Sequence, residues 1–167
     1  SFKFKNINNK ECNNPFYSLN HKVAGESENR KINRLIKIVK KKKIDYTFIS
    51  SGENICWLLN IRGKDLPNSP VANCKLILSQ HKKIYFFSPF EKILKIKSRF
   101  KKLQLSFHEE KDFFSILTYL NFGNFSVDHL TCSIFDEELI KSKFNINNKI
   151  DPIYYLKSIK NKTEIKN

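Results

Sequence analysis

The sequence of 167 residues contains no methionine, not even at its first position, which is Ser1. A natural product begins with methionine unless it is processed, so we expect a fragment or a processed piece of a longer protein. Long apolar runs are also absent. The longest, such as residues 84–87, fall far short of the roughly 20 residues that cross a bilayer. Nothing at the start resembles a signal peptide. We therefore expect a cytoplasmic protein with no membrane partner.

Cysteine pairs at short spacing are absent as well. The four cysteines lie far apart in the sequence, and no two of them form a Cys-x-x-Cys pattern. Structural zinc sites and small disulfide frameworks need regular, closely spaced cysteines. The sequence therefore predicts reduced thiols and no metal site at Cys12, Cys56, Cys74 and Cys132.

Arginine is scarce although the chain is strongly basic. The formal net charge is +15 at pH 7, yet only four of the 31 Lys and Arg residues are arginine. A high positive charge is typical of nucleic-acid binding, but bidentate recognition of phosphates and bases prefers arginine. The dense cluster at residues 40–43 closes an expected helix, where cations complement the helix dipole. A basic nucleic-acid-binding protein is kept as the second alternative function, and nucleic acid is not the partner that we expect.

What the sequence does contain is enough apolar material for one folded domain, with 40% hydrophobic and 13% aromatic residues. Apolar residues at helical spacing follow Ser27, an expected N-cap, and Asp151–Pro152 is an expected helix start. Strands and helices alternate, which predicts an α/β fold with a mixed sheet. Helices are expected over residues 27–43, 54–59, 90–100, 113–120 (with Gly123 as C-cap) and 133–140. Strands are expected over residues 44–49, 71–78, 84–87, 103–107 and 125–130. The strands over residues 71–78 and 84–87 are expected to form a hairpin.

The usual catalytic patterns have structural explanations here. His108-Glu109-Glu110 lacks the His-Glu-x-x-His spacing of a zinc site, and we expect a solvated helix entry. Asp128-His129 is an isolated pair at a strand end, which is weak as a triad signal. No Gly-x-Ser-x-Gly, phosphate-binding loop or dinucleotide pattern occurs. The sequence predicts no catalytic residue and no metal ligand in this chain.

One stretch, residues 53–70, concentrates the residues that recognition uses. It holds the only tryptophan, Trp57, followed by Arg62-Gly63 and Asp65 in a loop that Pro67 and Pro70 interrupt. Loops on a rigid scaffold are frequent positions for binding residues.

Residues 57–63, Trp-Leu-Leu-Asn-Ile-Arg-Gly, together with Asp65, Asn68 and Pro70, resemble the signature of the middle domain of three-domain Xaa-Pro aminopeptidases (aminopeptidase P). Two further blocks occur in the family's order. Residues 24–27, Ala-Gly-Glu-Ser, resemble its Gly-Glu-Ser segment, and residues 151–165 resemble the passage into its catalytic domain.

This resemblance implies the creatinase/prolidase amino-terminal fold, an α/β domain of the ribonuclease-H-like kind. Its mixed sheet has five or six strands and carries helices on both faces. Residues 1–14 are rich in Lys and Asn with little periodicity, which predicts a linker or the remainder of a preceding segment. The domain itself then covers residues 15–152, and residues 153–167 begin the connection to a catalytic domain.

The family's reaction removes an amino-terminal residue that precedes proline. The resemblance implies two bridged divalent ions, usually manganese, which generate hydroxide and stabilise the tetrahedral intermediate. Their ligands, two Asp, one His and two Glu, all lie in a carboxy-terminal pita-bread domain outside this sequence. No cofactor is therefore expected on this chain, which alone is expected to be inactive.

Five residues are candidates for a role in the site: Trp57, Asn60, Arg62, Gly63 and Asp65. One interpretation is that Arg62 and Asp65 line or brace a substrate cleft, where the arginine fork would meet a peptide carbonyl or carboxylate. The other is that Trp57 fills the core while Arg62 and Asp65 pair locally and fix the loop. The sequence leaves both open.

The first functional hypothesis is a non-catalytic domain of an Xaa-Pro metallo-aminopeptidase that shapes the substrate cleft and contacts the catalytic domain. Its partners would be the pita-bread domain, in the same polypeptide or as a separate chain, and a peptide substrate; a homodimer is left open. The alternative is a free-standing binding or regulatory module that kept the fold without the enzyme.

Overall fold

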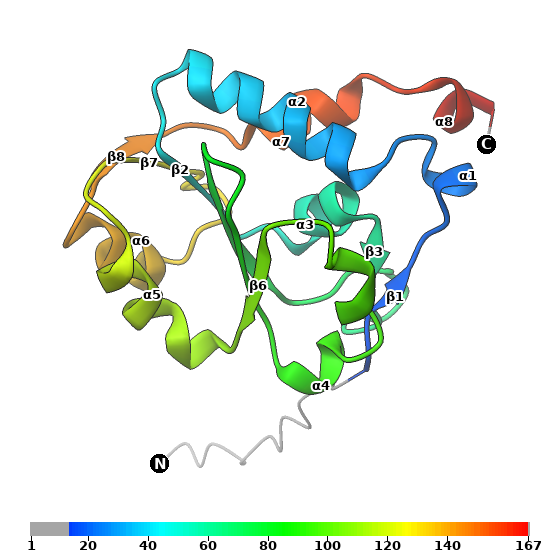
Figure 1. Ribbon diagram of the computed structural model, residues 1–167, viewed down its shortest axis with the longest axis horizontal. Helices are drawn as coiled ribbons and strands as arrows, with labels where there is room; N and C mark the ends of the chain where they lie inside the picture. The colour runs from blue at the N-terminus through cyan, green and yellow to red at the C-terminus, as the bar shows by residue number, and fades with distance from the viewer. Residues whose placement is uncertain (1–13, 167) are drawn as a thin grey trace, which may run out of the picture.

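The computed structural model describes residues 14–166, and they form a six-stranded mixed sheet with helices on both faces (Figure 1). The strand order is β6-β5-β4-β2-β7-β8. β4 runs antiparallel to β2 and β5, whereas the β2–β7, β7–β8 and β5–β6 pairs are parallel. The predicted α/β fold is confirmed. The strands are β2 (Tyr46–Ile49), β4 (Lys75–Ser79), β5 (Ile84–Phe87), β6 (Leu105–His108), β7 (Asn124–Val127) and β8 (Asn145–Asn148).

Two separate hydrophobic cores cover the two faces of this sheet. Helices α2 (Glu28–Lys41), α3 (Gly52–Leu59) and α7 (Pro152–Ser158) pack over the larger core, and α5 (Phe113–Tyr119) and α6 (Ile134–Lys141) over the smaller one. On β4, Leu76 and Leu78 enter the larger core and Ile77 enters the smaller one. This explains why its sequence is a continuous apolar run, as expected of a strand that is buried on both faces.

The remaining elements are short. β1 (Tyr17–Ser18) and β3 (Ile61–Arg62) form a small antiparallel sheet beside the main one. Figure 1 shows α8 (Lys162–Lys166) beside α1 (His21–Ala24), so the carboxy-terminal segment lies against the first described part of the chain. The other short helices are α4 (Phe90–Ile93), η1 (Lys97–Phe100) and η2 (Glu110–Asp112).

Local sequence signals set most helix starts, as predicted. Ser27 and Ser133 accept hydrogen bonds from the backbone N–H groups three residues later, at Arg30 and Asp136. Asp151 caps α7 by accepting from the N–H of Ile153, and proline occupies the first helical position. These caps satisfy N–H groups that have no partner within the helix.

Four expectations about single elements are wrong. The strand predicted over residues 125–130 ends at Val127. The predicted helix over residues 90–100 is broken into α4 and η1, because the spacing of Ile93 and Ile96 suits a turn of three residues as well as an α-helix. Gly123 is not the C-cap of α5, which ends at Tyr119; instead, a Cβ at this position would lie 2.7 Å from Asp45 Oδ2. The strand predicted from residue 71 begins only at Lys75.

Strand β8 was missed because asparagine, which is depleted in strands, fills three of its four positions. The predicted linker over residues 1–14 lies outside the described residues except for Asn14. The boundary at residue 152 stays a prediction, although Ile153 and Leu156 of α7 are buried in the larger core. In the part of the chain that the structure describes, no helix is long and apolar enough to cross a membrane.

Candidate functional site

Helix α3 carries Trp57 and ends at Leu59, directly before the family-like Asn-Ile-Arg-Gly run. Asn60 is its C-cap and adopts a left-handed conformation, with φ 52° and ψ 40°. Asparagine tolerates this conformation better than most residues do. The reversal turns the chain out of the helix and into β3. Trp57 is half-buried and packs against the larger core.

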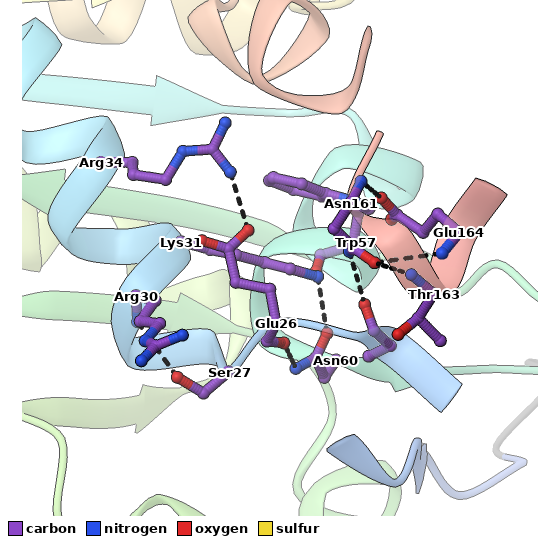
Figure 2. Close-up of polar contacts among 11 residues, drawn as sticks. Glu26, Ser27, Arg30, Lys31, Arg34, Trp57, Asn60, Asn161, Thr163 and Glu164 are labelled. Carbon is purple, nitrogen blue, oxygen red and sulfur yellow. Dashed lines mark hydrogen bonds and ion pairs between the residues drawn. The ribbon is translucent and has the colours of Figure 1, made fainter. Parts of the chain in front are cut away.

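Lys31 of α2 joins Trp57 and Asn60. Its Nζ donates to the carbonyl oxygen of Trp57 at 2.9 Å and to Oδ1 of Asn60 at 2.7 Å (Figure 2). The same ammonium lies 4.2 Å from the centroid of the Trp57 ring, in a cation–π contact. Only 2% of Lys31 is exposed, and loss of hydration lowers its pKa to about 8, against the attraction of Glu164 and Glu26.

The segment before α2 is tied to the same place. Asn60 Nδ2 donates to the backbone carbonyl of Glu26 at 2.9 Å, and the Glu26 carboxylate accepts from Arg34 NH1 at 2.7 Å. Asn60 therefore bonds to two different segments through its two side-chain atoms. Replacing it by a residue without an amide removes both bonds at once.

The carboxy-terminal segment completes the cluster through Asn161. Its Nδ2 donates to the carbonyl of Ala24 at 3.1 Å, and its Oδ1 accepts from the backbone N–H groups of Thr163 and Glu164, both at 3.0 Å. The N–H of Asn161 in turn donates to the Glu164 carboxylate at 2.9 Å, so this pair forms a capping box for α8.

Parts of the three blocks that carried the family resemblance thus meet in space: residues 24–27, Trp57 and Asn60 of the main block, and residues 161–164 of the last (Figure 2). We call this cluster the three-segment junction. Its residues are Ala24, Gly25, Glu26, Lys31, Trp57, Asn60, Asn161 and Glu164. Sequence reasoning found Trp57 and Asn60 but missed Lys31. A signal was present, because Lys31 lies one helical turn before Leu35 and thus on the apolar face of α2.

Arg62 and Asp65 have different partners from the expected ones. Arg62 NH1 donates to the carbonyl oxygens of Cys56 at 3.2 Å and Ile61 at 2.8 Å, at the end of α3. The Asp65 carboxylate is ion-paired with Lys92 and accepts from the backbone N–H of Asn73 at 2.7 Å. Among the described residues, Arg62 and Asp65 form no ion pair with each other, so the predicted local pair is wrong.

Gly63 is buried where the loop meets the start of the next strand. A Cβ at this position would lie 2.2 Å from the Cβ of Ala72, which is too close for any real contact. The N–H of Gly63 donates to the carbonyl of Pro70 at 3.2 Å. The Arg-Gly pair therefore combines a side chain that binds helix-end carbonyls with a backbone approach that only glycine allows.

The contacts of this site position chain segments. Burial raises the pKa of the Cys56 and Cys74 thiols, which keeps them in the neutral, unreactive form. Both thiols and that of Cys132 are free; Cys12 lies outside the described residues. Over residues 14–166, no group of three or more His, Cys, Asp or Glu side chains is arranged to hold a metal ion.

Residues 8–164 match the family model of the Creatinase/Prolidase N-terminal domain, and the chain belongs to this family. The predicted family is thereby confirmed. Its fold is also that of the X-prolyl aminopeptidase from Caenorhabditis elegans, described as a cytosolic enzyme with a di-nuclear active site. The two structures match with a TM-score of 0.80 and 24% sequence identity, over 92% of this chain and 26% of that one.

Two relatives of similar sequence are named as Xaa-Pro aminopeptidases, and both are much longer than this chain. Xaa-Pro aminopeptidase 1 from Dictyostelium discoideum is 27% identical over 155 residues, which are 91% of this chain and 24% of the relative. Xaa-Pro aminopeptidase app-1 from Caenorhabditis elegans is 30% identical over 102 residues, covering 60% of this chain and 16% of the relative. The chain therefore spans about a quarter or less of the length of the relatives it matches.

Proposed function

We propose that this chain is the non-catalytic, creatinase-like domain of a cytoplasmic, metal-dependent Xaa-Pro aminopeptidase, where it shapes the substrate cleft and contacts the catalytic domain. The observation that carries this proposal is that this chain is much shorter than the relatives it matches. A model of an N-terminal domain accounts for residues 8–164, while the same chain spans 24% of a relative named Xaa-Pro aminopeptidase. The remaining length of such a protein would hold the chemistry.

The metal is assigned to that other part of the protein. The structural neighbour described with a di-nuclear active site supports two metal ions, and manganese is our proposal for their identity. The described residues do not fit such a centre, because they contain no suitable cluster of His, Cys, Asp or Glu. No step of catalysis is therefore assigned to this chain.

Hydrolysis of an X-Pro-Pro peptide in the presence of manganese tests the proposal. We expect no cleavage by residues 1–167 alone and release of the first residue by the complete parent polypeptide. Activity of this chain alone would overturn the non-catalytic assignment. A parent without activity on such peptides, or a stop codon directly after residue 167, would favour the free-standing binding module.

A further inference from the structure

Helix α8 has little to hold it in place through apolar packing. None of its described residues is buried, so its position against the rest of the domain depends on polar contacts. The preceding helix, α7, is fixed differently, because Ile153 and Leu156 are buried in the larger core. Between Ser158 and Asn161 the chain therefore passes from a core-anchored helix to one that needs another anchor.

That anchor is the contact between Asn161 and residues 24–25. Gly25 has φ +69°, and a Cβ at this position would lie 2.1 Å from Oδ1 of Asn161 and 2.6 Å from its Cγ. The amide side chain thus occupies the space that glycine leaves open. Asn161 Nδ2 donates to the Ala24 carbonyl, and Oδ1 caps the first turn of α8. One side chain both starts the helix and fastens it to the domain.

The contact between Asn161 and residues 24–25 is coupled through Lys31 to the end of α3, where Trp57 and Asn60 lie. The carboxylates of Glu164, on α8, and Glu26, beside Gly25, attract the buried Lys31 ammonium. Lys31 in turn holds the Trp57 carbonyl and Asn60 Oδ1 at the end of α3. Hydrogen bonds also connect the two places: Asn161 bonds to the Ala24 carbonyl, and two residues further along the chain the Glu26 carbonyl accepts from Asn60, which accepts from Lys31.

We propose that Asn161, seated on Gly25, is a positioning residue that fixes the direction of the carboxy-terminal connection. The three-segment junction thereby holds a catalytic domain at a defined angle to the loop of residues 57–70. This inference rests on the proposed function, because it places that domain after the connection. It assigns to the Gly-Glu-Ser segment a mechanical role that is separate from any contact with substrate.

Four variants test this contact, and the two at Asn161 separate anchoring from capping. Asn161→Ala removes both the bond to Ala24 and the cap of α8. Asn161→Asp keeps an oxygen acceptor for the N–H groups of Thr163 and Glu164 but has no donor for the Ala24 carbonyl, so it removes the anchor alone. Lys160 directly precedes Asn161 and is exposed, so Lys160→Ala is the matched control. Gly25→Ala disrupts the same contact, because the added Cβ would occupy the position of the Asn161 amide.

The test is made in the complete parent polypeptide. Spin labels on an exposed position of α2 and on the catalytic domain report the distance between the two domains by pulsed electron resonance. We expect one narrow distance distribution for the wild type and Lys160→Ala, and a broad one for Asn161→Ala and Asn161→Asp. We also expect kcat to fall by at least about tenfold, because a displacement of about 1 Å can cost about 100-fold in rate. KM and the melting temperature should change little.

Unchanged distances and an unchanged kcat in both Asn161 variants would overturn the inference. A broad distribution for Asn161→Ala with a narrow one for Asn161→Asp would also overturn it, since capping alone would then be sufficient. Should Gly25→Ala fail to fold, the Asn161 variants still decide the question. A wild-type parent that cleaves no X-Pro peptide refutes the proposed function, whereas the distance measurement continues to test the junction.

Discussion

The carboxylate of Asp65 and the ammonium of Lys92 form an ion pair in which the two side chains are only 3% and 4% exposed. The two residues are 27 positions apart, one in the family-like loop and the other in α4. The Lys92 ammonium also lies 5.4 Å from the ring centroid of Phe16. This buried pair fastens the loop to α4.

Lys92→Met should destabilise the domain strongly, because it leaves the Asp65 carboxylate buried without a counter-ion. Removal of one partner of a buried pair costs about 3–5 kcal/mol, so we expect a loss of this size in the free energy of unfolding, measured in urea. The double variant Asp65→Asn/Lys92→Met should recover most of it, since Asn keeps an acceptor for the N–H of Asn73. Equal losses in the single and double variants would contradict the pairing.

Replacement of Asn60 should separate its backbone role from its side-chain bonds. Both Asn60→Gly and Asn60→Ala lose the bonds to Lys31 and Glu26, for which we expect about 1.5–3 kcal/mol, because one of them involves a charged group. Only the Ala variant also loses about 1–2 kcal/mol of stability because its Cβ disfavours the left-handed backbone conformation. Denaturant titration should therefore rank the stabilities Asn, Gly, Ala. A glycine variant as stable as the wild type would show that the side-chain bonds contribute nothing.

Arg62→Ala should affect stability more than catalysis. Because the guanidinium donates to the carbonyl oxygens of Cys56 and Ile61, we expect a loss of about 1–3 kcal/mol in the free energy of unfolding. In the parent enzyme, kcat/KM should stay close to that of the wild type. The opposite result, a loss of about tenfold or more in kcat/KM with an unchanged melting temperature, would show that Arg62 contacts the substrate.

The pH dependence of stability should contain a contribution from Lys31. Burial lowers its pKa from 10.5 to about 8 in the folded protein, so between these two values the unfolded chain binds more protons. Stability must therefore rise with pH across this interval. The difference in unfolding free energy between the wild type and Lys31→Met should increase from pH 8 to pH 10 and be constant below pH 7. A flat difference would show that Lys31 keeps its ordinary pKa.

The sequence predicted the features that depend on neighbouring residues. Ser27, Ser133 and Asp151 act as caps because a cap needs only a side-chain oxygen near the first helical N–H groups. The strands of the central hairpin were visible because both are dense in apolar residues. Strand β8 was not predicted, because only Ile146 among its residues favours a strand. Its pairing with β7 keeps it extended.

The partners at the candidate site depended on long-range packing and could not be predicted. A lysine such as Lys31 is expected in solvent, and only the fold places it under Trp57 and beside Asn60. Asp65 pairs with Lys92 of α4 and not with Arg62, whereas Arg62 bonds to the carbonyl of Cys56 in the last turn of α3. The role of the five candidate residues stays a prediction, and the sequence held no information on which of them touch.

The bond between Asn161 and Ala24 joins residues 137 positions apart, and it has a consequence for how this domain is made. During synthesis the amino-terminal part emerges first, yet α2 and α3 cannot complete the larger core until Ile153 and Leu156 of α7 arrive. The part of the larger core that α7 covers therefore stays open while most of the domain is already outside the ribosome. Translation of residues 151–161 therefore completes the larger core and brings Asn161 to Ala24.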